Sequence, residues 1–220
     1  MKNKRILFTA IFLLSSFTAW TLLILVIDTR PIGPNESVVG FATLNWFIHS
    51  ITGVNFTLYT LTDWLGIIPI VVALSFAFLG LTQWIKRKKL INVDKGLLFL
   101  GIFYIAVMLI FVFFEYVVIN YRPVLIDGRM EASYPSSTTL LVTTVMPTAI
   151  MQWNTRVKNK ALKIIIMSVS ITFIAFTVIC RILSGVHWIT DIIGGALLGA
   201  GLVTAYYSIM FERNHSNKTK

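Results

Sequence analysis

The sequence predicts an all-α integral membrane protein, a bundle of six transmembrane helices that forms one domain over residues 1–220. Three observations predict this fold class: hydrophobic residues make up 56% of the chain, charged residues only 13%, and the basic residues cluster beside apolar stretches. A soluble domain carries about 25% charged residues. Because a spanning helix needs about 20 apolar residues, six spans use roughly 120 residues and leave only short loops and tails.

Six apolar stretches are the predicted spans. The first shows no small-x-small cleavage site before Asp28, so it is interpreted as a retained helix and not as a cleaved signal peptide. The fourth is short and contains Pro147, which makes its ends the least certain. In chain order the predicted spans are residues 6–27, 65–84, 96–119, 138–153, 162–182 and 189–211.

Residues 28–64, between the first two spans, mix aromatic and polar residues and contain Pro31 and Pro34. An interfacial amphipathic helix suits this composition better than a further span. The predicted bundle therefore has a surface helix between its first and second transmembrane helices.

The distribution of basic residues predicts the orientation. Fifteen of the nineteen Lys and Arg residues lie in the two tails and in the loops after the second and fourth spans, all on one side of a six-helix bundle. The positive-inside rule makes that side cytoplasmic, so both termini are expected there. The net charge of +10 is thus explained by an anionic leaflet, and a nucleic-acid partner is not expected. The single cysteine, Cys180, excludes an intramolecular disulfide.

The chemistry-bearing residues gather at the opposite, outer ends of the helices. His187 and Asp191 are four residues apart and would share a face at the start of the sixth span, where the carboxylate can fix the imidazole tautomer. Arg181 precedes a Ser-Gly turn and Arg122 ends the third span, and each can direct a planar guanidinium at an anion. Pro135 is followed by three hydroxyl residues that open the fourth span, where a helix start favours phosphate: Ser136, Ser137 and Thr138.

Structural interpretations compete with this one. Arg181 and Asp191 could form an ion pair, His187 could be an interface residue beside Trp188, and the hydroxyl residues could only cap a helix. Taken singly, each of these is the commoner case. Ionisable residues that converge at one end of membrane helices favour a lipid-phosphate site.

These motifs resemble the type 2 phosphatidic acid phosphatase family, six-helix membrane enzymes whose signature ends in Ser-Arg-x5-His-x3-Asp. Here that part reads Cys180-Arg181, five residues, His187, three residues and Asp191. Arg122-Pro123 matches the end of the first part, Lys-x6-Arg-Pro, and Pro135-Ser136 the start of the second, Pro-Ser-Gly-His.

The resemblance implies that His187 is the nucleophile and Asp191 its orienting partner. It implies that Arg122, Arg181 and Ser136 hold phosphate oxygens, with Ser137 and Thr138 in the same binding segment. No metal and no cofactor are implied, because arginines and backbone N–H groups supply the charge stabilisation.

The chain departs from the family pattern at several positions. Glu115 stands where the family has Lys, Cys180 replaces Ser, and Ser137 and Thr138 replace the Gly-His of the second part. The missing histidine is the general acid of the family. A pyrophosphate leaving group has a second pKa of about 6 and can depart without a donated proton, which favours a lipid pyrophosphate such as undecaprenyl pyrophosphate. Glu115 is either a replacement acid with a pKa raised by burial or a salt-bridge partner of Arg122 or Arg129.

The predicted function is a phosphatase that releases phosphate from a lipid phosphate or lipid pyrophosphate at the outer face of a plasma membrane. The short loops favour a bacterial membrane. A non-catalytic relative that binds or moves a phospholipid is the alternative, since two signature parts are altered, although binding alone would not need His187 and Asp191. The sequence leaves the oligomeric state open.

Overall fold

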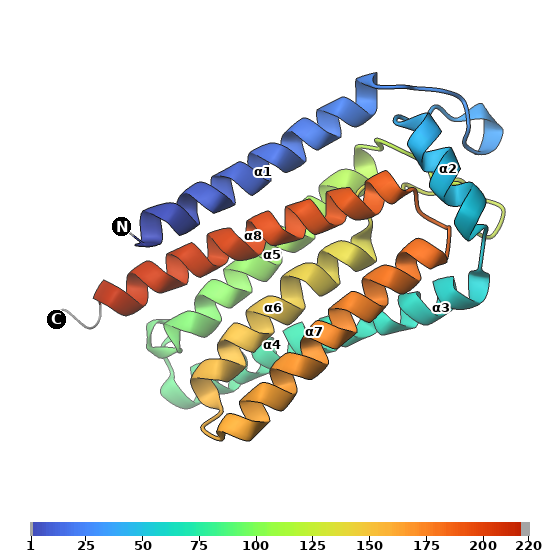
Figure 1. Cartoon of the computed structure of the whole chain (residues 1–220). Helices are drawn as coiled ribbons and strands as arrows, with labels where there is room; N and C mark the ends of the chain where they lie inside the picture. Colours follow the sequence, from blue (N-terminus) through green and yellow to red (C-terminus); the bar gives the residue numbers. More distant parts are fainter. Residues whose placement is uncertain (1, 217–220) are drawn as a thin grey trace.

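The computed structural model describes residues 2–216 and is almost entirely helical (Figure 1). The elongated helices run side by side, and the start of α1 and the end of α8 lie at the same end of the bundle (Figure 1). The α-helices are α1 (Lys2–Val26), α2 (Ala42–Thr52), α3 (Phe56–Leu65), α4 (Ile67–Arg87), α5 (Lys95–Tyr116), α6 (Ser137–Arg156), α7 (Lys160–Leu183) and α8 (Ile189–Ser216), with short 3-10 turns at Pro34–Glu36 and Leu90–Asn92.

Five helical segments among the described residues are long and apolar enough to cross a bilayer: Lys4–Val26, Phe56–Arg87, Lys95–Tyr116, Lys160–Leu183 and Ile189–Met210. The second corrects a predicted boundary, because it begins at Phe56 and not at residue 65. Asn55 caps its start by accepting a hydrogen bond from the backbone N–H of Leu58. Helix α3 then passes into α4 through the single residue Gly66, so it belongs to the bundle and not to the surface segment.

Helix α6, predicted from the sequence as the fourth span, completes the bundle although it is more polar than the five segments named above. It packs against α4, α7 and α8, and most of its first three turns are buried. Its threonine hydroxyls donate to carbonyls one turn earlier, as Thr144 does to Leu140 (2.7 Å) and Thr148 to Thr144 (2.8 Å). Because the polar atoms are satisfied inside the helix, a threonine-rich helix is stable at the centre of a membrane bundle. Its observed ends lie slightly outside the predicted residues 138–153.

Helix α2 lies across the end of the bundle, in agreement with the predicted surface helix (Figure 1). Its Asn45 is fully buried and donates to Gly40 O (2.8 Å) and Thr190 Oγ1 (3.0 Å). These bonds attach α2 to the first turn of α8. The segment that the sequence assigned to the membrane surface therefore also fixes the helix start that carries Asp191.

Candidate active site

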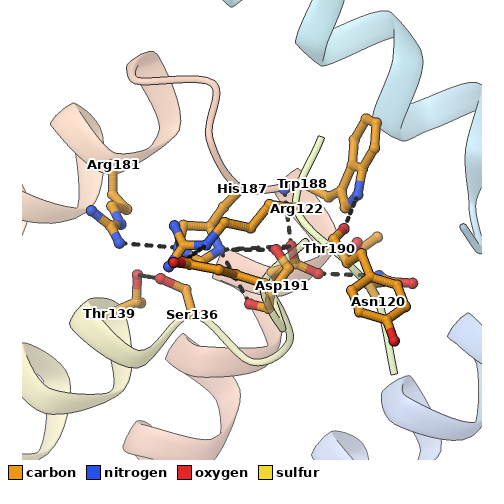
Figure 2. A network of polar contacts seen from close by, with 12 residues as sticks. Asn120, Arg122, Ser136, Thr139, Arg181, His187, Trp188, Thr190 and Asp191 are labelled. Carbon is orange, nitrogen blue, oxygen red and sulfur yellow. Dashed lines mark hydrogen bonds and ion pairs between the residues drawn. The ribbon is translucent and has the colours of Figure 1, made fainter. Parts of the chain in front are cut away.

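Polar residues from four parts of the chain converge at the end of the bundle that lies opposite the two termini (Figures 1 and 2). Arg122 follows α5, Ser136 precedes α6, Arg181 is in the last turn of α7, and His187 and Asp191 flank the start of α8. The structure thus brings together residues that the sequence predicted as one site, although they are far apart along the chain.

Two turns shape this end of the molecule. The segment between α5 and α6 folds back on itself, with Tyr121 and Ala132 forming an antiparallel bridge that places Arg122 near the start of α6. The turn between α7 and α8 needs glycine at position 185, where φ is +63° and a Cβ would lie 1.7 Å from the carbonyl oxygen of Gly53. This close contact holds the α7–α8 turn against the end of α2.

His187 is buried with its two ring nitrogens in different surroundings. Nε2 faces only donors, Nη2 of Arg181 at 3.1 Å and Nη1 of Arg122 at 3.3 Å (Figure 2). Nδ1 lies 3.1 Å from the carbonyl oxygen of Ser133, which can only accept. The neutral ring therefore carries its proton on Nδ1 and leaves the Nε2 lone pair toward the arginines. Burial, reinforced by the charges of Arg181 and Arg122, holds the pKa of His187 well below its ordinary value of 6.5.

The two arginines form a positively charged clamp around Nε2. Arg181 is 1% exposed, donates to Thr62 Oγ1 at 3.0 Å, and lies 4.0 Å from the exposed carboxylate of Asp63. Both guanidinium groups lie over the ring of Tyr59, at 5.0 Å for Arg181 and 5.5 Å for Arg122. The Nε atom of Arg181 has no hydrogen-bond partner among the described residues. Because guanidinium groups bind carboxylate and phosphate groups with matching geometry, this buried pair is a candidate anion site.

Asp191 accepts three hydrogen bonds but does not bond to His187 directly. Its carboxylate is fully buried and receives the Asn120 amide (3.1 Å), the backbone N–H of Trp188 (3.0 Å) and the hydroxyl of Ser133. The distance from its Oδ2 to His187 Nδ1 is 3.8 Å, which is longer than a hydrogen bond. The contacts of Arg181 described above do not include Asp191, so the alternative of an Arg181–Asp191 ion pair finds no support.

The three residues of the predicted hydroxyl segment lie in different surroundings. Ser136 is fully buried, accepts from the Thr139 hydroxyl (3.0 Å), and donates its backbone N–H to Asp191 O (3.0 Å). Ser137 and His187 line one small cavity. Thr138, which stands in place of the family histidine, is buried with its methyl group near Gly66.

The surroundings of Glu115 differ from those expected from the sequence. Its side chain is exposed and not buried, and Arg122 pairs with Glu131 (Nε–Oε2 3.0 Å) and not with Glu115. Glu115 nevertheless lines the same small cavity as Ser137 and His187. Its position at the site stays compatible with a role in proton transfer.

Sequence reasoning missed five residues that contact the predicted ones. Thr62 and Tyr59 come from α3, inside a segment that was assigned to the membrane surface, and nothing in their local sequence indicates a site. Asn120 and Ser133 lie two residues before Arg122 and Pro135, so a search of the motif flanks for hydrogen-bonding side chains would have found them. The backbone of Trp188 contributes without any sequence signal.

The fold and the site define a family of membrane proteins. The PAP2 superfamily profile matches residues 10–215, and the chain belongs to this family. A solved structure described as the first transmembrane PAP2-type phosphatidylglycerolphosphate phosphatase from Bacillus subtilis is similar in fold, with a TM-score of 0.62 and 17% identity, over 93% of this chain and 96% of that one. A search of the curated proteins gives no match. The predicted family is confirmed, and membership supports a membrane lipid phosphatase.

Proposed function

We propose that this protein is a membrane phosphatase that releases phosphate from a lipid phosphate or lipid pyrophosphate, with His187 as the nucleophile. The observation that carries the proposal is the neutral, buried imidazole whose Nε2 faces two guanidinium groups at 3.1 and 3.3 Å. A phosphoryl group held by Arg122 and Arg181 lies within reach of that lone pair. Nucleophilic catalysis by His187 then divides the transfer into two steps.

In the first step Nε2 forms a bond to phosphorus, and the bond from phosphorus to the leaving oxygen breaks with its electron pair. The ring now carries a positive charge, and the proton on Nδ1 stays in place. In the second step a water oxygen attacks phosphorus, the electron pair of the P–N bond returns to Nε2, and the proton that the water loses is carried away on the released phosphate. Arg122 and Arg181 stabilise the charge on the phosphoryl oxygens in both steps.

The leaving group favours a pyrophosphate. Thr138 has no titratable proton to replace the family's general acid, whose contribution is typically about 10² to 10⁴ in rate. A phosphate leaving group needs no proton, because its second pKa is about 6. A lipid pyrophosphate such as undecaprenyl pyrophosphate is therefore the proposed substrate. An apolar groove of about 820 Å³, lined by α4, α5 and α6, offers a surface for hydrocarbon chains.

The decisive experiment compares phosphate release by the purified protein from a lipid pyrophosphate and from the matching monophosphate. We expect the pyrophosphate to be preferred and H187A to abolish release. H49A is the matched control, because it removes a half-buried imidazole that packs on Trp188 (ring centroids 5.4 Å) without reaching the arginines. A clear monophosphate preference would contradict the proposed substrate. No release from any lipid phosphate would favour a phospholipid-binding or lipid-translocating role.

Glu115 remains a proposed proton donor, and its test is separate. If it protonates the leaving oxygen, E115Q should lower turnover of the monophosphate more than turnover of the pyrophosphate, because only the alkoxide needs the proton. Full turnover of both substrates across the pH range would show that Glu115 has no such role.

The proposed active site faces away from the cytoplasm of a bacterial plasma membrane. The basic loops after α4 and α6 support this orientation, because they lie at the end of the bundle opposite the site (Figure 1). In a variant with Cys180 replaced by Ala, a cysteine introduced at Arg129 should react with a membrane-impermeant maleimide in intact cells, whereas one at Lys158 should react only after lysis. The reverse pattern would refute the orientation.

A further inference from the structure

The hydroxyl of Ser133 occupies the gap between His187 and Asp191. Its Oγ lies 3.0 Å from His187 Nδ1 and also hydrogen-bonds to Asp191 Oδ2, whereas Nδ1 and Oδ2 are 3.8 Å apart. The carboxylate therefore reaches the imidazole through a serine and not by a direct bond.

The number of protons available determines the direction of the hydrogen bonds from His187 through Ser133 to Asp191. A hydroxyl has one proton, and an ionised carboxylate can only accept, so Ser133 donates to Asp191. The Ser133 lone pairs are then available to the Nδ1–H of His187, which its carbonyl oxygen also accepts at 3.1 Å. If the Ser133 hydroxyl instead donated its proton to His187, the Asp191 carboxylate would lose one of its three hydrogen bonds. The arrangement thus specifies the tautomer in which Nε2 is nucleophilic.

The surrounding backbone holds Ser133 at this position. Its side chain is buried, and its N–H donates to Asn120 O at 2.9 Å across the fold-back between α5 and α6. The Asn120 amide in turn holds the second oxygen of Asp191 at 3.1 Å. The same segment carries Arg122, so one structural unit sets the serine, the carboxylate and half of the phosphate clamp.

We propose that Ser133 is a positioning residue through which Asp191 orients and stabilises His187. This inference rests on the proposed function, in which Nε2 attacks phosphorus and the ring becomes positively charged. Because the charge is shared with Nδ1–H, the hydroxyl transmits the stabilisation from the carboxylate to the phosphorylated ring. The side-chain hydrogen bonds of Ser133 go to His187 and Asp191, so we expect its effect in the chemical step.

The experiment is a double-mutant cycle with S133A, D191N and the combined variant, measured as phosphate release by the purified full-length protein from a lipid pyrophosphate. Each single substitution should lower kcat about 10- to 100-fold, as expected for one hydrogen bond to a charged group. KM should stay within about twofold, because the phosphate clamp is intact. The combined variant should be no slower than the slower single variant. S170A is the control, because it removes a buried serine hydroxyl in the middle of α7.

Several outcomes overturn the proposal. If the losses in S133A and D191N multiply, Asp191 does not act through Ser133, and if S133A keeps full kcat the link is not used. Should S133A fail to fold, S133C replaces it, since the thiol is a weak donor, and full kcat in S133C contradicts the link. Release that survives H187A refutes the proposed function and the link together. If H187A abolishes release but the losses in S133A and D191N multiply, only the link is refuted.

Discussion

The two ends of this bundle both contain a network of polar side chains, and they differ in how charge is balanced. At the end that carries the termini, Arg156 pairs with Asp94 at 2.7 Å and hydrogen-bonds to Gln152, whose amide donates to Tyr206 Oη at 2.6 Å. At the other end, two arginines converge on a neutral imidazole. In the first network a carboxylate lies directly against the arginine, whereas in the second we propose that the two arginines bind the phosphate of a ligand.

Replacing one arginine at each end should separate these roles with the largest effect. R181Q removes half of the phosphate clamp and should lower kcat about 10²- to 10³-fold. It should not lower the melting temperature in detergent, because it relieves repulsion between Arg181 and Arg122. R156Q should keep its activity and lose about 0–1 kcal/mol of stability, since its ion pair is partly exposed.

The measurements are phosphate release and thermal unfolding of the same protein preparations. A loss of activity in R156Q that matches the loss in R181Q would show that the two ends are not functionally distinct.

The pH dependence of kcat/KM tests whether the two arginines lower the pKa of His187. Because burial and the two arginines hold the pKa of His187 well below 6.5, the free enzyme keeps a neutral nucleophile as the pH falls from 8 to 6. R122Q removes one of the lowering charges, so the pKa of His187 rises and the acid-side loss begins at a higher pH. Comparing both proteins on one substrate cancels the ionisation of the substrate. An acid limb that moves to lower pH in R122Q would contradict the assignment.

The sequence predicted the spans and the motif residues of the site, but not the residues that support them from other helices. His187, Asp191 and the arginines stand at fixed spacings around apolar stretches, so motif and hydropathy place them together. Helix α6 was predicted as a span over residues 138–153 and extends from Ser137 to Arg156, whereas Thr62 reaches Arg181 only through tertiary packing, which no local pattern indicates. The indirect link from Asp191 to His187 was also unpredictable, because a spacing of four residues specifies a shared helix face but not a distance.

Packing at the site end should be less tolerant than packing on the apolar wall formed by α4 and α5. At Gly194 in α8, a Cβ would lie 2.4 Å from the Tyr134 ring, whereas nothing lies within 4 Å of a Cβ at Gly80 in α4. We expect G194A to lose about 1–3 kcal/mol of stability from overpacking. G80A is the matched helical control and should melt like the unaltered protein. Equal melting temperatures for the two variants would show that α8 can move away from Tyr134 at no cost.

The smallest expected effect concerns Glu131, the exposed partner of Arg122. Its carboxylate lies 3.0 Å from Arg122 Nε with the side chain 42% exposed, so it competes weakly with a phosphate for the same guanidinium. E131Q removes that negative charge and should lower KM up to about fivefold, because exposed ion pairs contribute about 0–1 kcal/mol. The value of kcat should not change, since Glu131 does not contact His187.

Salt provides the internal check on this last prediction. The difference in KM between E131Q and the unaltered protein should shrink as ionic strength rises, because the competing pair is screened by mobile ions. E36Q neutralises an exposed glutamate that precedes α2 and should leave KM unchanged. A rise in KM in E131Q would mean that Glu131 positions Arg122 for the phosphate, so that the clamp depends on its acidic partner and the imbalance of charge at this end is smaller than the geometry indicates.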